Sequence, residues 1–106
     1  MGFANQQKML KQVQKMQAEM NRLQDEMGDM TVESTAGGGA VRCVMTCKQE
    51  IRELSIDPEL VDPDEIEMLQ DTLIIAINEA GRLAQEKAAA EMGKITGNVK
   101  IPGLFG

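Results

Sequence analysis

The chain has 106 residues, a formal net charge of -6, two cysteines and no histidine, tryptophan or tyrosine. This length suits a single domain, and the missing histidine removes the commonest acid–base and metal-ligating side chain. No nucleophile setting or phosphate-binding loop is recognisable, so we expect no enzyme, cofactor, metal or small-molecule substrate. No segment approaches the about 18 apolar residues of a membrane span. We therefore expect a cytoplasmic protein without membrane contact.

The hydrophobic core has to be built almost without aromatic side chains, because Phe3 and Phe105 lie at the two ends of the chain. Nine methionines share the packing with leucine, isoleucine and valine, and methionine is flexible and specifies geometry weakly. A lone monomer of this kind would be marginally stable, so we expect a homodimer.

Residues 5–27 are predicted to form a helix, because they lack glycine and proline and are rich in good helix formers. At about 100° per residue, its apolar residues gather on one face: Met9, Val13, Met16, Met20, Leu23 and Met27. Its cations fall within a sector of roughly 60° on nearly the opposite side: Lys8, Lys11, Lys15 and Arg22. We call these four residues the basic stripe. The apolar face favours packing on the chain's own sheet, with a short coiled-coil contact as the second interpretation.

Gly28 is expected to end this helix, and from Asp29 to Ile56 the apolar period changes to two. This pattern predicts three antiparallel strands, over residues 30–35, 41–48 and 51–56. The glycines at 37–39 are predicted to form the first turn, because glycine freely adopts positive φ. They lack the following helix and the Lys-Ser/Thr ending of a phosphate-binding loop. In the third strand, the expected apolar face carries one charge, Arg52.

Cys43 and Cys47 are four residues apart on a predicted strand, which would separate them by roughly 13 Å. This separation is too long for a disulfide bond. We expect two reduced thiols that serve as small apolar residues.

Residues 57–65 form an acidic loop that leads to a second predicted helix, from Pro63 to Met92. Asp62 is a candidate N-cap, and Gly93 is expected to end the helix. The helix has an apolar face: Ile66, Leu69, Leu73, Ile77, Ala80 and Ala84. The loop lacks the glycine and ligand spacing of a calcium site, so we interpret it as a solvated surface. These boundaries divide the chain into one domain, residues 1–93, and a loose tail, residues 94–106.

Charge is unevenly distributed along the chain. Residues 1–22 hold four cations and one anion, whereas residues 49–71 hold nine anions and Arg52. The N-terminal helix is therefore locally positive in an acidic protein. Its basic stripe fits either a solvated helix face or a surface for a polyanion such as DNA.

Four segments, in this order and at this spacing, together resemble the YbaB/EbfC family: residues 9–17, 33–41, 54–60, and 67–71 followed by 76–80. The resemblance runs from about residue 6 to Gly106. It implies an α+β fold with a helix, three antiparallel strands and a helix, which dimerises through its sheets. It also implies that residues 1–93 are a bacterial, nucleoid-associated DNA-binding domain that needs no cofactor. An effect on nucleoid organisation and gene expression would follow.

By position, the resemblance places six cations against double-stranded DNA, mainly at phosphates: Lys8, Lys11, Lys15, Arg22, Arg82 and Lys87. The alternative function is a non-enzymatic dimer that captures amphipathic peptides or partner proteins in a methionine-lined groove. DNA binding should weaken steeply with salt, whereas peptide capture should not.

Overall fold

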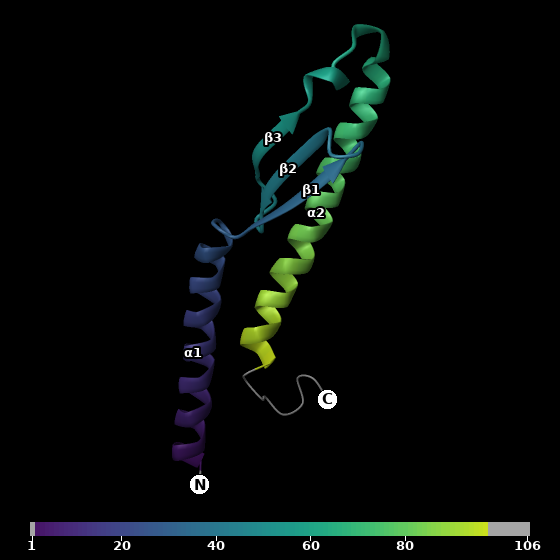
Figure 1. Cartoon of the computed structure of the whole chain (residues 1–106). Coiled ribbons are helices and arrows are strands. Elements are labelled where there is room, and N and C mark those ends of the chain that lie inside the picture. Colours follow the sequence, from purple (N-terminus) through teal and green to yellow (C-terminus); the bar gives the residue numbers. More distant parts are fainter. Residues whose placement is uncertain (1, 98–106) are drawn as a thin grey trace.

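The structure, a computed structural model, describes the backbone of residues 2–97 and the side chains of residues 5–95. Helix α1 (Gly2–Met27) precedes strands β1 (Thr31–Ala36), β2 (Val41–Thr46) and β3 (Ile51–Ile56). Two 3-10 turns, Pro58–Leu60 and Pro63–Glu65, then lead to helix α2 (Ile66–Gly97). The strands form one antiparallel sheet in the order β1-β2-β3, and Figure 1 shows α2 running across it. The predicted α+β fold is confirmed.

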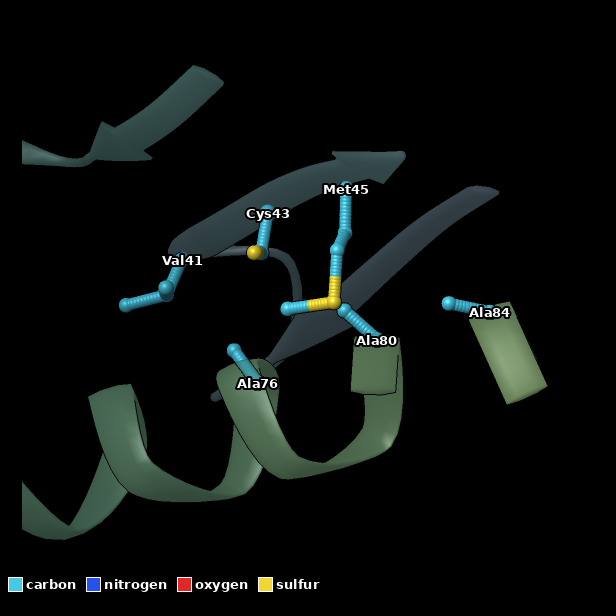
Figure 2. Close-up of a cluster of buried hydrophobic side chains, with 6 residues drawn as sticks. All are labelled: Val41, Cys43, Met45, Ala76, Ala80 and Ala84. Carbon is cyan, nitrogen blue, oxygen red and sulfur yellow. The ribbon is translucent and has the colours of Figure 1, made fainter. Parts of the chain in front are cut away.

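The main core lies between α2 and the sheet, with β2 as the central strand. Its buried residues come from β2 and α2: Val41, Cys43, Met45, Ala76, Ala80 and Ala84. Figure 2 shows the β2 side chains pointing toward the helix, with Met45 over Ala80. Alanine projects so little from the helix that α2 approaches the sheet closely, and the larger strand side chains fill the space between.

Strand β3 lies beyond the part of the sheet that α2 covers, because α2 packs on β1 and β2. Leu54 lies opposite Cys43, and Ile51 lies opposite Met45, so both continue the apolar sheet face. Their exposed fractions are nevertheless 43% and 47%. A register irregularity between Val44 and Met45 leaves Arg52 without a Cα partner on β2.

Helix α1 does not lie on the sheet, so the favoured interpretation of its apolar face is wrong. Its C-terminal half packs on the end of α2 instead, in a second cluster of buried residues: Leu23, Met27, Cys47 and Ile95. The sheet face that could have received α1 is already covered by α2 over β1 and β2. Residues 5–15 are exposed along their whole length, and this includes Met9 and Val13 of the apolar face.

Several predicted boundaries differ from the observed ones. Helix α1 begins at Gly2 rather than at residue 5, and α2 begins at Ile66 after a 3-10 turn. The prediction that Gly93 ends the second helix is wrong, because α2 continues to Gly97. Ile95, in this additional turn, is buried against α1, and that contact outweighs the roughly 1 kcal/mol cost of an internal glycine. Residues 94–97 therefore belong to the helix, and the rest of the predicted tail lies outside the described residues.

The first turn, the cap of the second helical region and the cysteines agree with expectation. Gly37, Gly38 and Gly39 have φ values of 65°, 68° and 92°. The Asp62 side chain accepts a hydrogen bond of 3.0 Å from the backbone N–H of Asp64. Both cysteines are free and buried, and burial raises the pKa of each thiol.

Candidate nucleic-acid interface

The lysines of the basic stripe lie on the face of α1 that points away from α2, whereas Arg22 lines the groove between the two helices. Leu23 and Met27 are buried against the end of α2, and Met16 and Met20 are partly buried beside them. Since the lysines of the stripe occupy nearly the opposite side of the same helix, they point away from this contact. Lys8, Lys11 and Lys15 are exposed, as expected from the sequence.

The stripe also contains most of the unpaired positive charge in the described part of the chain. Among the side chains of residues 5–95, four cations have neither an ion pair nor a side-chain hydrogen bond: Lys8, Lys11, Lys15 and Lys48. Three of the four belong to the stripe. An unpaired cation is available to a phosphate without first losing a carboxylate.

Arg22, the fourth member of the stripe, has a carboxylate partner on the same helix. Its Nε lies 3.6 Å from Oε1 of Glu26, one turn further along α1. Both side chains are mostly exposed, so this ion pair is weak and screened by salt. Arg22 can therefore exchange Glu26 for a phosphate at low cost.

Arg82 is held by carboxylates of its own helix. It donates hydrogen bonds to Glu79 and to Glu86, one turn to either side on α2. These carboxylates raise the pKa of Arg82, and the guanidinium lowers the pKa of Glu79. The group formed by these three residues carries a net negative charge and is a poor site for a phosphate.

Lys87 has a structural role, because its side chain links α2 to the sheet. Its Nζ donates a hydrogen bond of 3.2 Å to the backbone carbonyl of Thr31, at the start of β1. The residue is only partly exposed. Lys87 therefore ties α2 to the sheet, and the structure does not bring it together with the basic stripe.

Lys48 is an unpaired cation that the sequence analysis did not single out. It lies in the turn between β2 and β3, close to Gly28 at the end of α1. Its position at the end of a predicted strand was the only available signal, and proximity to α1 is a tertiary property. Lys48 adds a positive charge near the C-terminal end of the stripe's helix.

Seven of the seventeen acidic residues gather at the opposite end of the molecule from the exposed part of α1. They occupy the two 3-10 turns and the start of α2, which Figure 1 shows far from the N-terminus: Asp57, Glu59, Asp62, Asp64, Glu65, Glu67 and Asp71. No group of three potential metal ligands is found within the described residues. The separation keeps the acidic end from neutralising the basic stripe.

Two surface grooves bear on the alternative of peptide capture. One, of about 470 Å³, lies between α2 and the turn after β2 and contains a single methionine: its lining is Met45, Gln49, Ile77, Asn78, Gly81, Arg82 and Gln85. The other, of about 250 Å³, separates α1 from α2 and is lined mainly by charged side chains. Neither is a methionine-lined groove. Within residues 2–97, no helix has the length and apolar character needed to span a membrane.

Comparisons with known proteins agree with the geometry. A model of the YbaB/EbfC DNA-binding family matches residues 1–99. A nucleoid-associated protein of Pelotomaculum thermopropionicum is 57% identical over 101 residues, which cover 95% of this chain and 96% of that protein. A nucleoid-associated protein of Desulforamulus reducens is 59% identical over 101 residues, with the same coverage. A crystal structure of an uncharacterized protein from Helicobacter pylori shares the fold, with a TM-score of 0.71 at 24% identity over 91% of this chain and 98% of that one.

Proposed function

The chain belongs to the YbaB/EbfC DNA-binding family, and from this premise we propose that it binds duplex DNA as a homodimer through the basic stripe. Membership makes it a nucleoid-associated DNA-binding protein rather than an enzyme. The mode of binding is our proposal. It assigns the contacts to phosphates, which give affinity without sequence preference.

The observation that carries this proposal is the concentration of unpaired cations on one face of α1. Lys8, Lys11 and Lys15 have no carboxylate partner, and they follow one another along about 11 Å of exposed helix. Arg22 extends the same line by two turns. A row of cations at helical spacing can follow a phosphate backbone, whereas Arg82 and Lys87 already have partners within the fold.

The homodimer is proposed from an apolar surface that the protomer leaves uncovered. Ile51 and Leu54 on β3 are half exposed, and Ile51 lies opposite Met45, which lines the same groove as Ile77. Ile74 is 55% exposed and lies one helical turn before Ile77, on the same flank of α2. A second copy that covers this surface would bury apolar area on both partners, which a core without aromatic residues needs.

Two protomers would present eight stripe cations to one duplex. If about six of them neutralise phosphates, log K should fall against log salt with a slope of roughly -5. The test is a gel-shift series on unrelated duplexes at several salt concentrations, with the parent and the double variant Lys11→Gln/Lys15→Gln. Glutamine keeps helix propensity nearly constant. We expect uniformly weaker binding and a shallower slope.

The matched control is Arg42→Gln/Arg82→Gln, which removes two cations that are already paired outside α1. This variant should bind DNA almost like the parent. Equal loss in both double variants would mean that net charge, rather than the stripe, determines affinity. Parent-like binding by the stripe variant would remove the stripe from the interface, and salt-independent capture of amphipathic peptides would then favour the alternative function.

A further inference from the structure

The connection between α1 and the sheet is short and consists of residues 28–30, which we call the joint. Helix α1 ends at Met27, and β1 begins at Thr31. The N–H of Met30 donates to the carbonyl of Glu26 at 3.1 Å, and the carbonyl of Met30 accepts from the N–H of Cys47 at 2.8 Å. Beyond this joint, the direction of α1 is held mainly by its packing on the end of α2.

That packing specifies the direction of α1 weakly. Methionines supply much of the contact, with Met16, Met20 and Met27 on α1 facing the end of α2. Methionine side chains adapt to small displacements because each has three rotatable bonds. The groove of about 250 Å³ between the two helices leaves further room for movement. A contact with a defined direction is therefore needed at the joint to fix a single angle between α1 and the sheet.

Arg52 supplies such a contact from β3. Its Nη2 donates a hydrogen bond of 2.7 Å to the carbonyl of Gly28 and lies 3.7 Å from Oδ1 of Asp29. The last turn of α1 contains no basic residue, so Arg52 is a cation at the negative end of the helix dipole. Its planar guanidinium fixes the direction of approach better than a flexible ammonium group does. The irregularity in β3 leaves Arg52 free of a Cα partner, and the side chain reaches the joint.

A small rotation at the joint is amplified along α1. Lys11 is 16 residues before Met27, or about 24 Å along the helix, so a rotation of about 10° moves it by roughly 4 Å. This displacement exceeds the rise of about 3.4 Å per phosphate along one DNA strand. We infer that Arg52 is a positioning residue, which holds α1 at the angle that aligns the basic stripe with the phosphates. The expected effect of Arg52 on DNA binding rests on the proposed function, whereas its expected effect on the structure of the joint does not.

The test combines two measurements on Arg52→Gln, Arg52→Lys and the control Arg42→Gln. Hydrogen exchange without DNA should show faster exchange at residues 28–31 and 47 in Arg52→Gln, and no change there in the control. Gel shifts should show roughly threefold to tenfold weaker DNA binding by Arg52→Gln with the parent's salt slope. Arg52→Lys, which keeps the charge but not the planar fork, should recover only part of both properties. If Arg52→Gln does not fold, the same two measurements on Arg52→Lys test the inference.

Each contrary result has a distinct meaning. Parent-like exchange in both Arg52 variants would show that Arg52 does not hold the joint. A salt slope that becomes shallower by about one per protomer would make Arg52 a phosphate contact instead of a positioning residue. Full recovery of both properties in Arg52→Lys would show that Arg52 acts through its positive charge alone and not through its planar guanidinium. If the parent itself does not bind DNA, the proposed function fails, and the exchange measurement still decides whether Arg52 holds α1.

Discussion

Gly37 lies directly against Thr72: a Cβ atom placed on this glycine would come within 2.9 Å of Thr72 Cγ2. Gly38 shares the positive φ, but a Cβ atom there would meet nothing within 4 Å. Gly38→Ala should therefore cost about 1 kcal/mol of unfolding free energy through backbone strain alone. Gly37→Ala should cost about 2 kcal/mol, because the close contact adds to the strain. Chemical denaturation at one fixed protein concentration measures both.

The control for this prediction is Thr72→Ser, which removes Cγ2 but keeps the hydroxyl that donates to the carbonyl of Met68. Combined with Gly37→Ala, it should remove the excess cost and leave only the backbone strain. If Gly37→Ala and Gly38→Ala cost the same, the contact with Thr72 is unimportant. DNA affinity per folded protein should be unchanged in all of these variants, because the turn has no place in the proposed interface.

The elements that the sequence predicted well are those whose side-chain period is set by their own backbone. The strand alternation around Cys43 and the helical period through Leu23 are local properties, and both are confirmed. The end of α2 was predicted wrongly because Gly93 is a local stop signal. The helix continues because Ile95 packs on residues far away in the chain, and such contacts are not visible in a local pattern.

The residues of the candidate site likewise divide into those that a local sequence pattern could predict and those that it could not. The stripe follows from helix geometry, so the exposed face of Lys8, Lys11 and Lys15 could be predicted. The ion pairs of Arg82 could also have been predicted from the sequence, because Glu79 and Glu86 are three and four residues away on the same helix. The hydrogen bond of Lys87 joins residues 56 apart in the chain, and no sequence pattern indicated it.

The proposed dimer predicts that Leu54→Glu separates the protomers. The charge would lie in an apolar surface that the second copy buries, and an unpaired buried charge is costly. Light scattering should give about twice 11.6 kDa for the parent and a clearly smaller mass for the variant. The parent's melting temperature should rise with protein concentration.

Val61→Glu is the matched control for the dimer, because Val61 is an exposed apolar residue in the connection before α2. It should remain dimeric. A parent of 11.6 kDa with a concentration-independent melting temperature would contradict the dimer. Dissociation of both variants would place the interface elsewhere.

The buried cysteines predict a slow thiol reaction and a loss of stability at alkaline pH. Burial raises the pKa of Cys43 and of Cys47, so the folded protein favours the neutral thiols, which are poor nucleophiles. Their contribution to stability is complete below the unfolded-state pKa of about 8.5 and is lost as the pH rises through the folded-state value. Thiol reagents should react slowly at pH 7.5 and rapidly in denaturant.

Melting temperatures at pH 7.5 and 9.5 provide the second measurement for the cysteines. The decline between the two should be smaller in Cys43→Ala/Cys47→Ala, which has no thiol to ionise. Rapid labelling of the native protein at pH 7.5 would show that the thiols are accessible, contrary to their burial in the structure.

The ion pair between Arg22 and Glu26 predicts a variant that binds DNA more tightly. Glu26→Gln removes the carboxylate 3.6 Å from Arg22 and leaves the fourth stripe cation unpaired. It also removes an anion near the C-terminal end of α1, where the helix dipole disfavours negative charge, so the helix should not be weakened. Gel shifts should show higher affinity and a salt slope steeper by up to about two per dimer, since one more phosphate per protomer is engaged.

The control for Glu26→Gln is Glu53→Gln, which makes the same change in net charge on the sheet. Glu53 pairs with Arg42, and Arg42 keeps Glu33 as a partner in this variant. Its DNA affinity should stay close to that of the parent. An equal gain in both variants would mean that overall charge governs binding. No gain in Glu26→Gln would mean that Arg22 does not reach the duplex, and the interface would then reduce to the exposed lysines at the N-terminal half of α1.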